Sequence, residues 1–177
     1  MHLSSERTRT GCGQLRRVSV VSALERFPEA RLGHVGPLLV GVWYSQATLR
    51  ALEALEKHQL ELAKQHGPIT NLSITVKIPK APGPEAQEWL KRSEPTLRGS
   101  SRGTVIVILE RGLGAIIART FIAGASLISS ANMQVVKTIA EGVDRVRALP
   151  NQHASLLDDA GLVDALSAFA RQPATQS

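Results

Sequence analysis

The chain has 177 residues, of which 43% are hydrophobic, enough to build the core of a single domain of ordinary size. Cys12 is the only cysteine, so neither an intrachain disulfide nor a cage of thiolates can hold the fold. The net charge of +6 is dispersed and aromatic residues make up 3% of the chain, which argues against a nucleic-acid partner. We expect a cytoplasmic protein without an export signal, because polar residues interrupt the apolar runs near the N-terminus.

The first folded element is predicted after a stretch without sustained hydrophobic periodicity. Residues 1–30 have the composition of a flexible arm. Two apolar runs follow, at 31–35 and 38–43, and they flank the turn dipeptide Gly36-Pro37. This pattern predicts a β-hairpin.

A helix and a strand are predicted next. Thr48 is a suitable N-cap, because its side chain can accept a hydrogen bond from an amide of the first turn. Leucines follow at helical spacing until Gly67-Pro68, which ends the helix. Apolar and polar residues then alternate over 72–78, which predicts a strand with one buried face.

The second helix begins at Pro84, since a missing amide costs nothing at the first helical position. It contains Trp89, and we expect it to end before Pro95. The run at 105–109 has no polar alternation and predicts a strand covered on both faces, as in the middle of a parallel sheet.

The last part of the pattern begins with an apolar segment, 113–130, which predicts a long buried helix. A short strand over 133–137 follows, and Thr138 with Glu141 forms a capping box for another helix. Residues 151–177 form a C-terminal tail with one loosely docked helix.

The order of these elements predicts an α/β domain over residues 31–150. Strands that alternate with helices imply right-handed crossovers and a mixed, mostly parallel sheet of about four or five strands with helices packed against it. Residues 1–30 and 151–177 lie outside this domain.

The strand at 105–109 leads into Gly112 and Gly114, an arrangement that invites a dinucleotide-binding interpretation. The third small residue of that motif is replaced by Ile117, and no acidic residue lies about 20 positions further on to bind a ribose. The serines lack a nucleophile motif. We therefore expect no cofactor and only a tight turn from strand to helix.

The titratable residues form no catalytic or metal-binding pattern. His58 and His66 are too far apart along a helix to share one metal ion, and we expect both to be solvated. Glu85 and Glu88 could lie on one helix face as a general acid and base, but acids are expected in the first turn because of the helix dipole. We expect a protein that is not an enzyme and holds no metal.

The apolar segment 113–130 approaches the length of a membrane span, but it is rich in small residues and lies between two strands of one sheet. Its large side chains, including Ile117 and Phe121, are distributed over more than one helix face. One side could pack on the sheet and the other on a second copy, which predicts a homodimer and no membrane span.

The stretch from Leu38 to Leu149 resembles STAS-like domains, the superfamily of bacterial anti-sigma factor antagonists, in an uncharacterised bacterial branch. The resemblance rests on Trp43 at the end of the entry strand, a leucine-rich helix, and the runs LSITVKI, VIVILERG, GAIIART and VVKT with AEGVDRV. It implies a mixed sheet flanked by helices, and for signalling members an Asp-Ser pair at a junction of strand and helix, where a partner kinase phosphorylates the serine. At 78–84 this chain has no acceptor hydroxyl.

From this resemblance we expect a non-catalytic interaction module that binds a bacterial regulatory protein without a phosphorylation switch. The candidate contacts lie on the rim from Pro79 to Trp89 and on the apolar segment: Lys80, Glu85, Trp89, Ile117 and Phe121. The alternative is a carrier of a small molecule or lipid that uses the 113–130 helix to line a pocket.

Overall fold

A computed structural model of the protein describes residues 19–77, 82–112 and 132–173. The strands are β1 (Ser22–Arg26), β2 (Ala30–Val35), β3 (Leu38–Trp43), β4 (Ile69–Thr75), β5 (Ser101–Ile108) and β6 (Met133–Val136). The helices are α1 (Leu49–His66), α2 (Pro84–Gly99), α4 (Ile139–Arg147), α5 (Ala154–Leu157) and α6 (Leu162–Arg171).

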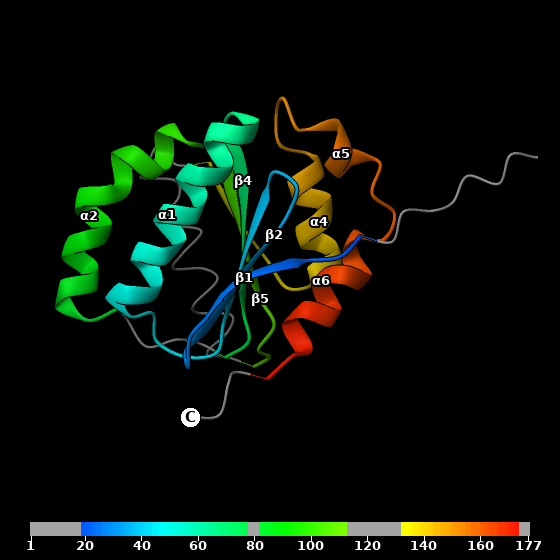
Figure 1. The fold of residues 1–177 in the computed structure, drawn as a ribbon. Helices are drawn as coiled ribbons and strands as arrows, with labels where there is room; N and C mark the ends of the chain where they lie inside the picture. The colour runs from blue at the N-terminus through cyan, green and yellow to red at the C-terminus, as the bar shows by residue number, and fades with distance from the viewer. Residues whose placement is uncertain (1–18, 78–81, 113–131, 174–177) are drawn as a thin grey trace, which may run out of the picture.

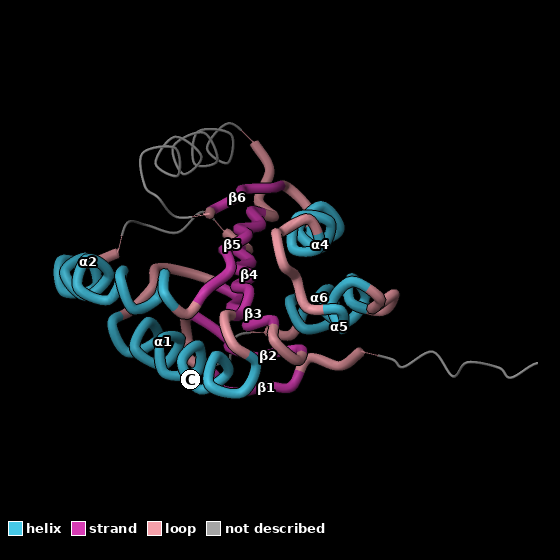
Figure 2. The backbone as a smooth tube through the Cα atoms, turned by 90° about the horizontal axis from the view of Figure 1, so that it is seen from above, coloured by secondary structure: helices cyan, strands magenta, loops and turns pink. Residues whose placement is uncertain are grey.

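The strands form one sheet with six strands in chain order, β1 to β6. The first three are antiparallel, whereas β3, β4, β5 and β6 are parallel. Helices α1 and α2 cover one face, and α4, α5 and α6 cover the other, with the sheet between them (Figures 1 and 2). The prediction of an α/β fold with a mixed, mostly parallel sheet flanked by helices is confirmed, with six strands in place of the expected four or five.

The predicted hairpin is formed by β2 and β3. Val35 pairs with Leu38 across Gly36-Pro37, and Gly36 has a φ of 51°, which a glycine adopts without the steric cost of a side chain. The prediction of a flexible arm up to residue 30 is wrong for its last part, because β1 pairs with β2 and Phe27 is buried. β1 is an edge strand whose side chains are exposed or half-buried, so it lacks the apolar alternation that marks a strand.

Helix α1 and strand β4 lie close to their predicted positions. The Thr48 hydroxyl accepts a hydrogen bond from the Ala51 amide at 3.3 Å, and the helix ends at Gly67, as predicted. Strand β4 begins at Ile69, three residues before the predicted start at 72. The alternation of apolar and polar residues correctly assigned side chains to the two faces of β4. The polar face of β4, however, lies beneath α1 and α2 and not in solvent.

A buried polar network joins this face of the sheet to the helices. Gln59 of α1 is 1% exposed, and its amide nitrogen donates to the Leu97 carbonyl and the Ser100 hydroxyl, both at 2.7 Å. Its side-chain oxygen accepts from Asn71 of β4 at 3.0 Å. One side chain therefore ties α1, the end of α2 and the centre of the sheet together.

Replacing Gln59 with alanine should lower the free energy of unfolding by about 1–3 kcal/mol, because it removes three hydrogen bonds to half-buried partners. Urea denaturation measures this loss, and Gln65→Ala on the exposed end of the same helix is the matched control. The double variant with Asn71→Ala should lose less than the sum of the two single variants. Additive losses would contradict direct coupling between these side chains.

Helix α2 does not end before Pro95, as the sequence predicted, but continues to Gly99. The proline removes one backbone hydrogen bond from the helix interior and strains the preceding turn. The last turn is nevertheless held by tertiary contacts, since Gln59 bonds the Leu97 carbonyl and the half-buried Leu97 side chain packs on the cluster beneath α1 and α2. Tertiary packing therefore overrides the local signal.

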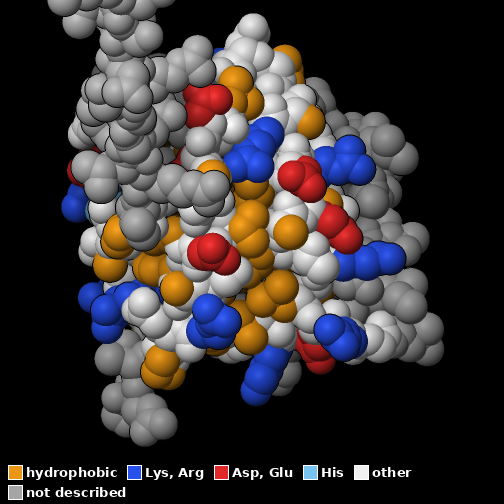
Figure 3. Space-filling model, turned by 90° about the vertical axis from the view of Figure 1, so that its right-hand side faces the viewer, with side chains coloured by type: hydrophobic (Ala, Val, Ile, Leu, Met, Phe, Trp, Pro, Cys, Tyr) orange, Lys and Arg blue, Asp and Glu red, His pale blue; other side chains and the backbone are white. Residues whose placement is uncertain are grey.

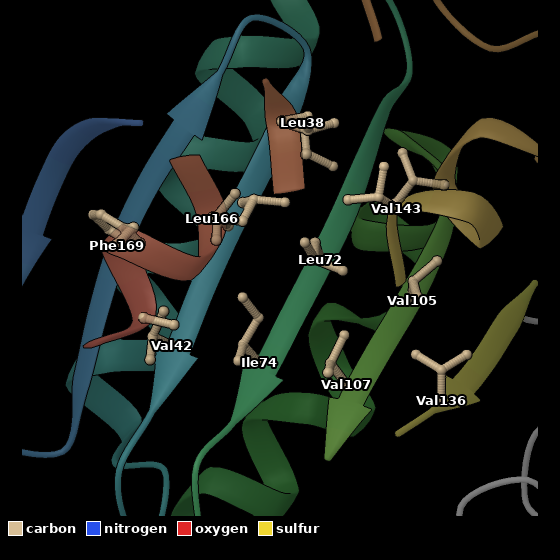
Figure 4. Close-up of a cluster of buried hydrophobic side chains, with 14 of the residues drawn as sticks. Leu38, Val42, Leu72, Ile74, Val105, Val107, Val136, Val143, Leu166 and Phe169 are labelled. Atoms are coloured by element: carbon tan, nitrogen blue, oxygen red, sulfur yellow. The ribbon is translucent and has the colours of Figure 1, made fainter. Parts of the chain in front are cut away.

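The largest hydrophobic cluster lies between the sheet and helices α4 and α6 (Figure 4). Val105 and Val107 of β5 are fully buried there, whereas Ile106 on the other face is half-buried, so the prediction of a strand covered on both faces is confirmed in full for one face. Thr138 is the N-cap of helix α4, and its hydroxyl accepts from the Glu141 amide at 3.1 Å, while the Glu141 carboxylate accepts from the Lys137 amide at 2.9 Å. The predicted cap is confirmed. The Glu141 carboxylate, however, binds the amide of Lys137 and not that of Thr138, as a capping box would have it.

The C-terminal part of the chain belongs to the core. It forms two helices in place of one loosely docked helix, and Leu162 and Leu166 of α6 are fully buried. The Ser19 hydroxyl donates to the Asp159 carboxylate, so the chain before β1 is tied to the loop before α6. The predicted helix over 113–130 lies outside the described residues. In the part of the chain that the structure describes, no helix has the length and apolarity needed to cross a membrane.

Candidate functional site at the carboxyl edge of the sheet

The parallel strands β3 to β6 end at the same edge of the sheet, in the lower part of Figure 1. In α/β sheets, ligands bind in the crevices outside the carboxyl ends of the strands, because the loops there are free of the packing that fixes the core. Two concave surfaces flank this edge, one on each face of the sheet.

The first surface, which we call the α1–α2 groove, has a volume of about 470 Å³ and lies where the two helices begin. Its lining residues come from the loop before α1 and the start of α2: Gln46, Ala47, Thr48, Leu49, Gly83, Pro84, Glu85 and Ala86. Thr48 stabilises one wall, because its hydroxyl caps α1 and also donates to the Glu29 carboxylate.

The start of α2 supplies backbone donors to the groove. The N-cap is Gly83, and no described side chain caps this helix. The amides of Glu85 and Ala86 are in the first turn, where backbone donors have no partner within the helix. The side-chain amide of Gln87 donates to the Pro82 carbonyl at 2.7 Å and so holds the loop before α2 against the first turn of the helix. This wall therefore presents donors next to an apolar surface.

The second surface, the α6 pocket, has a volume of about 380 Å³ and lies on the opposite face. Its lining residues come from the ends of β3, β4 and β5 and from α4 and α6: Tyr44, Val76, Leu109, Ile139, Ser167, Ala170, Arg171, Gln172 and Pro173. The Tyr44 hydroxyl donates to the Gln172 carbonyl at 2.7 Å and holds the end of α6 against the sheet.

A buried arginine lies beside Tyr44. Arg31 of β2 is 5% exposed, and its guanidinium carbon lies 4.4 Å from the centre of the Phe169 ring. Its Nε atom has no hydrogen-bond acceptor, and Arg31 forms no ion pair with a carboxylate among the described residues. The cation–π contact with Phe169 is its clearest stabilising interaction.

Burial shifts the pKa values of both residues. It lowers the pKa of Arg31, and the neighbouring Arg26 lowers it further by charge repulsion. Burial raises the pKa of Tyr44, while Arg31 and Arg26 oppose this rise. Both arginines therefore lie close enough to Tyr44 to create a positive potential at this side of the α6 pocket.

The residues predicted as partner contacts do not form one surface. Glu85 is exposed and lines the α1–α2 groove. Trp89 is only 4% exposed and belongs to the cluster beneath α1 and α2, so its prediction as a surface contact is wrong. It lies three residues after Ala86 and four before Ser93, on the buried face of the helix. Lys80, Ile117 and Phe121 lie outside the described residues.

His58 and the possible metal ligands are the remaining chemical candidates. His58 is not solvated as expected but is 9% exposed, with its ring nitrogens 3.6 Å from a Glu25 oxygen and 3.3 Å from a Glu61 oxygen. The contact with Glu25 joins α1 to β1, whereas Glu61 lies on α1 itself. Within residues 19–77, 82–112 and 132–173, no three His, Cys, Asp or Glu side chains are placed to hold a metal ion.

The α6 pocket was missed at the sequence level. Tyr44, Val76, Leu109 and Ile139 each follow or begin a separate element, and only the folded sheet brings them together. Arg31 gave one usable signal, because it is a charged residue within an otherwise apolar strand.

Comparison with protein-family models, with curated proteins and with solved structures finds no match. The resemblance to STAS-like domains therefore stays a prediction.

Proposed function

We propose that the chain is a non-catalytic interaction module that binds a partner protein in the α1–α2 groove. One observation carries this proposal: the groove places unpaired backbone donors of α2 next to the apolar side chains of Ala47, Leu49 and Ala86. A short extended segment of a partner could supply carbonyl acceptors and an apolar side chain together. Glu85 would favour a basic residue in the same segment.

The walls of the groove are suited to recognition because rigid elements hold them. Ala86 is buried in the same cluster as Trp89, and Thr48 caps α1. A preformed site loses little conformational entropy on binding. The resemblance stated above would make the partner a bacterial regulatory protein, and the missing hydroxyl at 78–84 would make binding independent of phosphorylation there.

Site-specific crosslinking tests this proposal. A photo-reactive benzophenone residue is placed at Glu85 and, as a control, at Gln65 on the exposed far end of α1. We expect a discrete crosslinked protein from position 85 only. The partner identified by the crosslink is then purified and titrated against wild type, Ala47→Glu and Gln65→Lys. Ala47→Glu should bind the partner at least about tenfold more weakly than wild type, since it buries a charge in the contact.

Equal binding by Ala47→Glu and Gln65→Lys would contradict the groove as the docking site, as would the absence of a specific crosslink at position 85. Urea denaturation of each variant separates a lost contact from a lost fold.

The carrier and homodimer hypotheses depend on the segment 113–130, which lies outside the described residues. Native mass spectrometry of freshly purified protein separates them, because a co-purified ligand on a monomer favours the carrier. An empty dimer favours the interaction module.

A further inference from the structure

The α6 pocket has an apolar floor built from four different elements. Val76 and Leu109 follow β4 and β5, Ile139 begins α4, and Ala170 lies near the end of α6. All four pack on or belong to the large cluster on this side of the sheet, so the floor is anchored to the core. Figure 3 shows this side of the molecule, where hydrophobic side chains form a band between charged residues.

The charged side chain that lines this floor is positive. Arg171 lines the pocket directly, and Arg31 and Arg26 lie close enough to Tyr44 to oppose the rise in its pKa that burial causes. Along the chain, Lys77 follows Val76 and Lys137 lies two residues before Ile139, whereas Glu110 follows Leu109 and Glu141 lies two residues after Ile139. Basic side chains also predominate at the lower end of the surface in Figure 3, which is the carboxyl edge of the strands.

Arg171 is the charged residue of the pocket lining, and Arg31 adds a buried positive charge beside the lining residue Tyr44 without lining the pocket itself. A buried guanidinium without a carboxylate partner is costly, because burial removes its hydration and nothing replaces the lost opposite charge. The Nε atom of Arg31 has no acceptor in the described chain, and the ring of Phe169 compensates only in part. An anion bound at Arg171 would add an opposite charge on this side of the sheet, where Arg26 already repels Arg31.

We propose that the α6 pocket binds a small organic acid with an apolar body. The body packs against Val76, Leu109 and Ile139, and the carboxylate lies at Arg171 in the positive potential of Arg31 and Arg26. The volume of about 380 Å³ is at the lower end of the range for ligand pockets, which suits a small ligand. A bare inorganic anion would leave the apolar floor unused. This site shares no lining residue with the α1–α2 groove.

Three matched probes test the charge and the apolar body separately. Octanoate carries both, octanol lacks the charge, and acetate lacks the body. Each is titrated into isotope-labelled full-length protein below its aggregation concentration and followed by the amide NMR signals of residues that line the pocket. We expect octanoate to bind most tightly, with shifts confined to the α6 pocket.

Variants of Arg171 identify the anion contact. Arg171→Gln should weaken octanoate binding about tenfold, because it removes a charged hydrogen-bond donor, whereas Arg171→Lys should retain most of the affinity. The matched control is Arg145→Gln, which removes an exposed arginine of α4 that does not line the pocket. Octanol should bind equally to all three variants.

Two results would overturn the proposal. Equal affinities for octanoate and octanol in wild type would mean that the pocket does not recognise an anion. Shifts scattered over the surface, or equal losses in Arg171→Gln and Arg145→Gln, would mean that octanoate binds through general charge attraction. Neither result bears on the partner in the α1–α2 groove, which is tested with variants of that groove.

Discussion

Replacing Trp89 with alanine should lower the free energy of unfolding by about 3–5 kcal/mol, because the change removes a large buried side chain and leaves a cavity. Trp89 is 4% exposed and packs in the cluster of buried residues between α1, α2 and the sheet. The sheet residues of this cluster include Leu32 and Trp43, so the cavity would separate α2 from the sheet. Chemical denaturation followed by circular dichroism measures the loss.

Leu90→Ala is the matched control, since Leu90 is the next residue of the same helix and is 37% exposed. It should cost less than about 1 kcal/mol, because little apolar area is lost from the core. A Trp89→Ala variant as stable as Leu90→Ala would contradict the packing of α2 described above.

The expected loss of stability makes Trp89→Ala unsuitable for testing partner binding. A loss of binding in Trp89→Ala would report a disturbed α2 and not a missing contact. The half-buried Ala47 and the exposed Glu85 both line the groove and are therefore better probes, although they offer a weaker sequence signal than a tryptophan.

The elements that the sequence predicted well are those with strong local signals. Helix α1 has a threonine cap, regular leucine spacing and a terminal glycine, and all three depend on neighbours within a few residues. The β2–β3 hairpin and the Thr138 cap are local in the same sense. Such signals are independent of the rest of the fold, which is why they are readable from one sequence.

The features that were missed depend on contacts between distant parts of the chain. Strand β1 is a strand because it pairs with β2, although its own side chains are mostly outside the core. Helix α2 continues through Pro95 because its last turn bonds to α1. The α6 pocket likewise needs β3, β4, β5, α4 and α6 together, and no segment alone carries its pattern.

Helix α6 is the clearest example of a segment whose role becomes visible only in the fold. The sequence predicted a loosely docked tail, yet α6 places Leu162, Leu166 and Phe169 in the main cluster. Figure 4 shows Leu166 and Phe169 beside the strand side chains. Gly33 of β2 makes this fit possible, because a Cβ atom there would lie 2.8 Å from the edge of the Phe169 ring.

Replacing Leu166 with alanine should therefore lower the free energy of unfolding by about 2–5 kcal/mol, the range for a buried leucine whose cavity closes incompletely. Leu166 is fully buried, whereas Asp164, two residues earlier on α6, is exposed, so Asp164→Ala is the matched control and should change stability little. Urea denaturation compares the two variants with wild type.

The size of this loss distinguishes an integral helix from a docked tail. If α6 were only loosely attached, Leu166→Ala would free the helix while the rest of the domain kept its stability and its single unfolding transition. If α6 completes the core, the whole transition shifts to lower urea and stays cooperative, because the β3 and β4 side chains lose their cover together. The Arg31–Phe169 contact would be disturbed in the same variant, so octanoate binding in the α6 pocket should weaken while partner binding in the α1–α2 groove remains.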